Sequence, residues 1–204
     1  MTNLHSLTEK DRQIISLERL FRGQKSALVI FGPKEVLRKF AEQLNLLELE
    51  DYSGVDPSKI SVWEIGKNKD AKLLEIEYLF INMPNLLENE QFWWQVTLYA
   101  KKNESVWGRL FSLPKFPLGS KSEDERPKRF NTQIRAVVFS ESDKRRNDLA
   151  ATLQKIGQDQ LIKIPRPYSN EQLYKNFVSR SMIPFSEHNL LLRAEEIFRL
   201  IGRS

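Results

Sequence analysis

Short apolar runs alternate with amphipathic stretches along most of this chain. The runs have the length of β-strands and end in polar turns, whereas the stretches between them space their apolar residues three or four positions apart, as amphipathic helices do. The expected strands cover 27–31, 59–65, 73–81, 134–139 and 161–164. The expected helices cover 8–22, 34–44, 88–102, 142–156, 169–177 and 190–201. Strands that alternate with helices favour an open, largely parallel sheet.

Local signals support several of these boundaries. Thr8 can cap the first helix and Gly23 can end it. Pro33 suits the first turn of a helix, where its missing N–H costs little. Ser169 and Gln172 have the spacing of a capping box. The run 27–31 is continuously apolar, which indicates a central parallel strand covered on both faces.

Together these elements predict an α/β fold with three layers, in which helices cover both faces of a mostly parallel sheet. We expect an α/β core domain over 1–165 with an irregular insertion at about 109–132, and a short C-terminal helical appendage over 166–204. At 204 residues the chain can bury one sizeable core.

Composition narrows the class of protein. Cys is absent, which excludes disulfides and thiolate metal sites, and no apolar run is long enough to span a bilayer. The N-terminal residues lack the basic start and apolar block of a secretory signal, so we expect a cytoplasmic protein. The net charge of +5 permits acidic partners or nucleic acid.

The most suggestive motif begins at the first apolar run. The sequence ALVIFGPKEVLRKFAEQL at 27–44 has the strand, Gly-Pro turn and helix of a nucleotide-binding P-loop. A working loop carries G-x-x-x-x-G-K-S/T, whose glycines wrap the phosphates while Lys and a hydroxyl group serve the terminal phosphate and Mg²⁺. Counting from Gly32, the later positions hold Leu37, Arg38 and Lys39. The scaffold is therefore predicted without its chemical groups.

Taken in order, several segments resemble the AAA+ branch of the P-loop ATPases. These segments are the loop entry at 17–33, the apolar strand at 78–83, the strand at 136–141, the strand, Pro turn and helix at 161–177, and a truncated lid helix at 190–202. Asn82 and Met83 stand where the family usually has two acids that serve Mg²⁺ and the attacking water. We therefore expect no ATP hydrolysis, no catalytic or metal-binding residues and no cofactor.

Two other interpretations of the same pattern stay open. The strand and turn at 27–33 also suit another α/β fold, such as a flavodoxin-like domain. An enzyme of unrelated α/β type is a further alternative, because an active site can be assembled from residues that lie far apart in the sequence.

Two neighbouring tryptophans are candidates for a partner surface. If 88–102 is a helix, Phe92 and Val96 share one face while Trp93 and Trp94 spread around the circumference. At least one Trp then lies away from the main core. It either anchors a protein partner, since Trp is common in binding hot spots, or packs under the irregular segment that follows.

Basic residues gather in two places. The segment 109–129 is either a solvated loop or an insertion that binds nucleic acid. The cations after Ser142 meet either an external acidic or phosphate partner or a neighbouring acidic loop. The candidate residues are Arg109, Lys115, Lys121, Arg126, Lys128, Arg129, Lys144, Arg145 and Arg146.

The resemblance and its missing groups together favour a non-catalytic, AAA-like subunit that binds protein partners in a larger complex, for example beside an active ATPase. The alternative is a nucleic-acid-binding accessory protein that uses the basic insertion 109–129 and the cluster 144–146.

Overall fold

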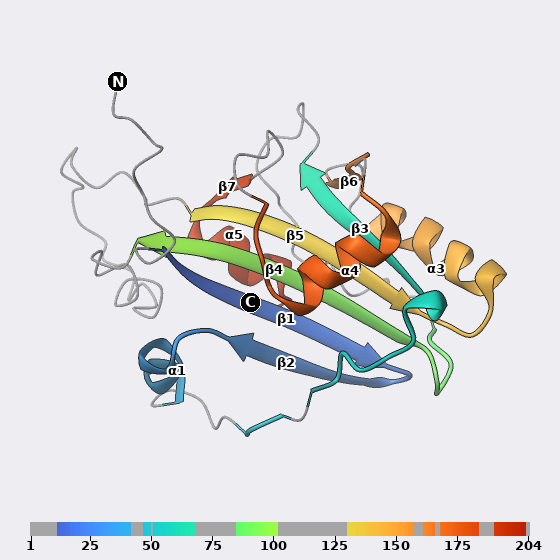
Figure 1. Ribbon diagram of the computed structural model, residues 1–204, viewed down its shortest axis with the longest axis horizontal. Coiled ribbons are helices and arrows are strands. Elements are labelled where there is room, and N and C mark those ends of the chain that lie inside the picture. The colour runs from blue at the N-terminus through green and yellow to red at the C-terminus, as the bar shows by residue number, and fades with distance from the viewer. Residues whose placement is uncertain are drawn as a thin grey trace, which may run out of the picture.

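The computed structural model describes residues 12–41, 47–49, 51–67, 85–101, 130–156, 161–165, 168–183 and 190–202. A single antiparallel sheet organises these residues (Figure 1). Its seven described strands are β1 (Arg12–Arg22), β2 (Lys25–Phe31), β3 (Ile60–Lys67), β4 (Gln91–Lys101), β5 (Phe130–Phe139), β6 (Leu161–Lys163) and β7 (Leu190–Leu192). The strand order is β2-β1-β4-β5-β3-β6, and β7 pairs with β5 at Phe130–Thr132.

Helices cover both faces of this sheet. The described helices are α1 (Lys34–Ala41), the single 3-10 turn η3 (Pro57–Lys59), α3 (Asp143–Ile156), α4 (Asn170–Val178) and α5 (Ala194–Leu200). Figure 1 shows α4 crossing in front of the strands, and α5 partly hidden behind them. We call the side covered by α4 the front face, and the side covered by α3 and α5 the back face. No helix in the described ranges is long and apolar enough to cross a membrane.

The two strands at one end of the sheet, β1 and β2, form a tight hairpin. Arg22 pairs with Lys25, so the turn between β1 and β2 has two residues. Gly23 occupies the first of them with φ of +53°, as the first position of a type II′ turn requires and as glycine adopts without steric cost. From this turn β2 stays in register with β1 over seven consecutive pairs.

Each face of the sheet has its own apolar core. On the back face Leu17, Trp94 and Ala136 pack with Leu149 of α3 and Ile197 of α5. On the front face Trp93 and Val137 pack with Leu173, Tyr174 and Phe177 of α4, with Tyr52 at the edge of the cluster. The fold therefore has three layers, but its middle layer is antiparallel.

The expected parallel α/β fold is wrong. Every strand pairing in the described residues is antiparallel. The resemblance to AAA+ ATPases is wrong for the same reason, because a P-loop follows a central parallel strand. The apolar run 27–31 instead belongs to β2, which lies at one end of the strand order. The terms P-loop and pseudo-ATPase therefore do not describe this chain.

Two predicted helices are strands. The stretch predicted as the helix 8–22 forms β1 from Arg12 onward, and the stretch predicted as the helix 88–102 forms β4. In β1, Ile15 and Leu17 face the back while Ser16 and Glu18 face the front, and all four side chains are buried. Apolar and polar side chains therefore alternate over 15–18, which is the pattern of a strand. Ile14, Leu17, Leu20 and Phe21 also fall at helical spacing by coincidence, and the helix prediction rested on them.

Other predicted elements are confirmed. The strands at 59–65, 134–139 and 161–164 correspond to β3, β5 and β6, and the helices that follow Pro33, Ser142 and Ser169 correspond to α1, α3 and α4. The predicted C-terminal helix divides into β7 and α5. The predicted strand 73–81 lies outside the described residues, as does 109–129 of the predicted irregular insertion, whose last residues 130–132 instead belong to β5.

Candidate functional site

A row of polar side chains crosses the front face at the centre of the sheet. Glu18 of β1 lies opposite Gln95 of β4, Gln95 lies opposite Arg135 of β5, and Arg135 lies opposite Glu64 of β3. All four residues are at most 2% exposed, in a layer that is usually apolar. We call these four residues the polar row.

Hydrogen bonds join the polar row to the end of α4. Arg135 Nη1 donates to Gln95 Oε1 and to the carbonyl of Asn176, both at 3.1 Å. Gln95 Nε2 donates to Glu18 Oε1 at 2.9 Å and to the carbonyl of Phe177 at 3.0 Å. The last carbonyls of a helix have no partner within the helix, and a cation there interacts favourably with the negative end of the helix dipole. These two carbonyls also accept from the N–H groups of Ser181 and Arg180, and the row adds side-chain donors that hold the C-terminal end of α4 to the sheet.

Gln133 of β5 extends this connection beyond α4. Gln133, also buried, accepts from Arg135 Nη2 at 2.9 Å and exchanges two hydrogen bonds with the main chain of Ile183, at 2.8 and 3.0 Å. Residues on both sides of the end of α4 are therefore held to β5 by side chains of β4 and β5.

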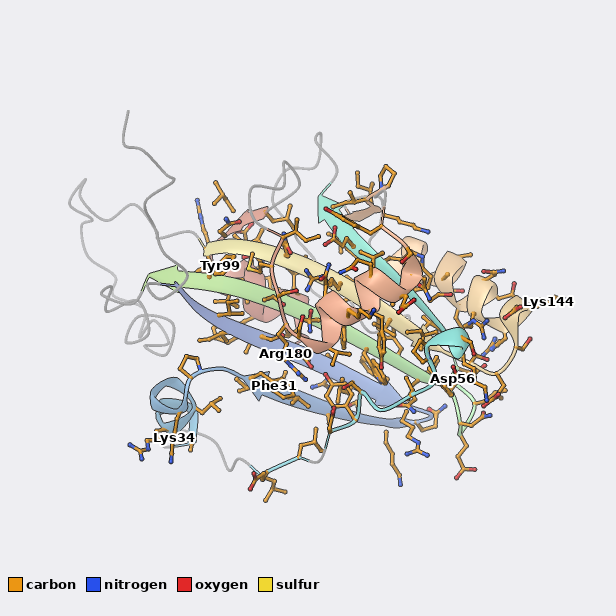
Figure 2. All side chains as sticks on the ribbon, in the orientation of Figure 1. Phe31, Lys34, Asp56, Tyr99, Lys144 and Arg180 are labelled. Atoms are coloured by element: carbon orange, nitrogen blue, oxygen red, sulfur yellow. The ribbon has the colours of Figure 1, made fainter. Side chains whose placement is uncertain are left out.

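Arg180 brings a second cation to the row. It has φ of +53°, a left-handed conformation that costs a residue with a side chain roughly 1–2 kcal/mol. Its Nε lies 3.3 Å from Glu18 Oε1, and its guanidinium carbon lies 3.3 Å from the centre of the Phe31 ring (Figure 2). This strained residue therefore links α4 to both strands of the β1–β2 hairpin.

The charges of this site balance in pairs. Arg135 Nε lies 3.6 Å from Glu64 Oε1, and Arg180 lies against Glu18. Burial raises the pKa of Glu18 above its usual value, although Arg180 and hydrogen bonds from Ser16 and Gln95 act in the opposite direction. A carboxylate with a raised pKa can serve as an acid. Here its hydrogen-bond partners are other buried groups of the same site, so the arrangement serves to hold structure together.

The described residues offer no metal centre. Within those ranges His, Asp and Glu nowhere gather in a group of three that could hold an ion. A hollow of about 630 Å³ does lie beside β3, between α3 and α4. Lys163, above the Trp63 ring at 5.6 Å, and the side chains of Asn147 and Tyr168 line it.

The basic cluster at the start of α3 is largely used within the protein. Lys144 is exposed and points away from the sheet in Figure 2. Arg145 Nε lies 2.9 Å from Glu90 Oε1, and a further hydrogen bond reaches the carbonyl of Asn85. Burial would raise the pKa of Glu90, but hydrogen bonds from Arg145 and from the Leu87 N–H hold it below its usual value.

Arg146 is buried rather than exposed. Its guanidinium group contacts the carboxylate of Asp143 and donates to the carbonyls of Ser140 and Ser58. Of the three cations 144–146, Lys144 thus keeps its side chain in solvent while two hold α3 against neighbouring loops.

The two tryptophans lie on opposite faces of β4. Trp93 packs in the front core, where Tyr52 meets it edge-on at 5.1 Å and Phe177 stacks at 5.7 Å. Trp94 packs in the back core. Both are buried, at 1% and 4% exposure, so the structure places them in the two cores and not on a surface. The remaining candidates, Arg109, Lys115, Lys121, Arg126, Lys128 and Arg129, lie outside the described residues.

The short β6 pairs with only 65–67 of β3, and a side chain closes the rest of that edge. Beside β3, the amide of Asn170 accepts from the Val62 N–H at 2.8 Å and donates to the Ile60 carbonyl at 2.9 Å, as a neighbouring strand would. Ile164 N–H closes the same edge at Glu64. No described strand pairs with the outer side of β2.

Sequence reasoning missed both the polar row and the open edge. A signal for the row does exist, because β1, β4 and β5 each carry two polar residues spaced by two, namely Ser16 and Glu18, Gln95 and Thr97, Gln133 and Arg135. No feature of β2 alone indicated the open edge, because the order of strands in a sheet depends on which distant segments pair.

Comparison with known proteins adds no family. The sequence matches no protein-family model, and the searches of curated proteins and of solved structures also gave no match.

Proposed function

We propose that this chain is a protein-binding module without chemistry of its own, and that the outer edge of β2 is its binding surface. The observation that carries the proposal is the position of β2. It is a seven-residue strand at the end of the sheet, and in the described part of the chain no strand lies on its outer side. An unpaired strand edge is a template for another chain.

The polar row supports the same conclusion from the inside. Its two carboxylates, its amide and its guanidinium group lie between the sheet and α4 and interact with one another, and the amide and guanidinium groups also bond to main-chain carbonyls. Groups that act on a substrate have to reach it, and these four side chains are almost completely excluded from solvent.

Site-specific photo-crosslinking tests the proposal. A benzophenone amino acid replaces Ala27, which is exposed on β2, and in a matched variant it replaces Ala151, which is exposed on α3. In cells that naturally make the protein, we expect a discrete protein adduct from position 27 and a much weaker one from position 151. Equal adducts from both positions, or none from position 27, would contradict a binding surface at β2.

Nucleic-acid binding is the second candidate, and the net charge of +5 is what supports it. The cluster 144–146 gives this candidate little support, because Arg145 and Arg146 already pair with groups of the protein itself. Electrophoretic mobility shifts at two salt concentrations test it with Lys144→Glu and with Lys128→Glu. Binding that weakens steeply with salt and with either change would favour this candidate.

A further inference from the structure

The outer side of β2 presents a regular set of main-chain groups. Lys25 and Arg22 close a two-residue hairpin, so their pair is hydrogen-bonded, and the pairs alternate from there. Ala27, Val29 and Phe31 therefore bond to β1, whereas Ser26, Leu28 and Ile30 direct their N–H and C=O groups outward. The bond from the Gly23 N–H to the Glu90 carbonyl confirms this alternation, because odd-numbered residues of β1 face β4. Three donors and three acceptors thus face away from the sheet.

The described strand β2 itself lacks three features that usually protect an edge. Natural edge strands carry Pro, a bulge or inward charges, which prevent pairing with other chains. β2 has the sequence KSALVIF, with a charge at its first residue alone and no Pro. Its seven consecutive pairs with β1 contain no bulge. By contrast, the part of β3 that β6 does not pair with is protected, because Asn170 occupies the place of a strand there.

The side chains along this edge are apolar in the middle. Leu28 and Ile30 are half-buried against the back core, and Val29 and Phe31 are half-buried on the front. Part of each apolar side chain is therefore accessible to a chain that binds beside β2. An added strand with apolar residues at its centre would cover them.

Positive charge gathers at both ends of β2. Residues 19–41 contain six Lys or Arg and one Glu, a net charge of +5 that equals the net charge of the whole chain. Arg22 and Lys25 are exposed at the hairpin end, and Lys34 and Arg38 are exposed at the α1 end (Figure 2 labels Lys34). Exposed acids follow at Glu48 and Asp51, so the positive charge belongs to the strand ends and not to the whole side of the molecule.

A second copy of the chain suits this edge poorly. Antiparallel pairing of two β2 strands about Leu28 would place the Arg22 and Lys25 end of one copy against the Lys34 end of the other. Like charges at such short range oppose pairing.

We infer that β2 binds an extended segment of a partner protein, which adds to the sheet as a further strand and carries apolar residues at its centre and acidic residues at both ends. This inference rests on the proposed function and specifies its partner. Main-chain hydrogen bonds to Ser26, Leu28 and Ile30 supply affinity, the half-buried apolar side chains supply contact area, and the cations at the two ends select acidic flanks.

Synthetic peptides test this directly by fluorescence polarisation with the full-length chain. The probe has the sequence Asp-Glu-Val-Thr-Val-Thr-Val-Glu-Asp, and the charge control replaces each acid with Lys. We expect the acidic probe to bind saturably and at least about tenfold more tightly than the Lys peptide at low salt, with the difference shrinking at high salt.

A matched pair of variants isolates the main-chain bonds. Leu28→Ala shortens the side chain and keeps the outward N–H, whereas Leu28→Pro also removes the N–H. We expect Leu28→Pro to weaken binding of the acidic probe at least about tenfold more than Leu28→Ala does. If Leu28→Pro fails to fold, N-methylation of the probe at alternate residues replaces it. N-methylation of the probe residues whose N–H groups face β2 should abolish binding to the wild-type chain, and N-methylation of the residues between them should leave binding intact.

The outcomes separate the two proposals. Equal binding of acidic and Lys peptides, or indifference to both patterns of N-methylation, overturns the acid-flanked added strand. A crosslink from position 27 together with that result would leave a binding module whose partner has a different chemistry. No crosslink from position 27 and no probe binding would overturn both.

Discussion

The side chains of Glu18 and Arg135 determine how the front layer of this protein holds together. Both are completely buried, and both bond to groups that belong to other strands or to α4. Burying a charge is costly unless it is paired and hydrogen-bonded. The stability of the fold should therefore be most sensitive to changes that leave one member of the polar row without its partner.

Removal of Arg135 provides the first test. Arg135→Met leaves Glu64 in the interior and takes a hydrogen-bond donor from the carbonyl of Asn176. We expect a loss of about 3–5 kcal/mol in the free energy of unfolding, measured by urea denaturation. The double variant Arg135→Met with Glu64→Gln should recover a substantial part of that loss. A double variant as unstable as the sum of the two single variants would contradict a paired role for these residues.

The pH dependence of stability tests Glu18. Its pKa in the folded state is raised above the usual 4.5, so the protonated form favours folding. The wild-type chain should therefore lose stability as the pH rises from 4.5 through the raised value, while Glu18→Gln should not. We expect the melting temperature of Glu18→Gln, relative to wild type, to increase by a few degrees across that window.

Replacement of an exposed acid gives the control for total charge. Glu88→Gln removes one negative charge at an exposed position near the β1–β2 hairpin. If both variants gave the same pH-dependent change in melting temperature, the effect would come from net charge and not from the burial of Glu18.

At the scale of elements, local caps predicted the helices α3 and α4, whereas the sequence of β1 and of β4 was assigned to helices. Ser169 caps α4 by accepting from the Gln172 N–H, and Ser142 accepts from the Arg145 N–H at the start of α3. These are local interactions, and local signals predict them. The identity of β4 instead depends on Gln95 meeting partners from β1, β5 and α4, which no window of β4 contains.

Asn170 tests how the edge of β3 is closed. Its amide makes one bond as acceptor and one as donor to the main chain of β3. Asn170→Ala should cost about 1–3 kcal/mol, because two buried main-chain groups lose their partners. Asn170→Asp keeps the acceptor for the Val62 N–H, so the Val62 amide should exchange more slowly in this variant than in Asn170→Ala. Rapid exchange at Val62 in Asn170→Asp, equal to that in Asn170→Ala, would contradict this account.

At the scale of the whole molecule, the predicted parallel α/β fold is wrong, because the direction of the strands could not be read from the sequence. Helices pack on both faces of the sheet, but the sheet is antiparallel. Strand order and direction depend on contacts between distant segments, such as β1 with β4 and β3 with β5. The position of β2 at the end of the sheet follows from that order, and so does the binding surface proposed for it.

Residue-resolved hydrogen exchange tests the central claim, which is that β2 is an open edge that accepts another strand. In the free protein we expect the amides of Ser26, Leu28 and Ile30 to exchange rapidly, while those of Ala27 and Val29 are protected by β1. Addition of the acidic peptide should slow the first three and leave the other two unchanged. Slow exchange of Ser26, Leu28 and Ile30 in the free protein would contradict the claim, and so would a bound state in which they still exchange rapidly.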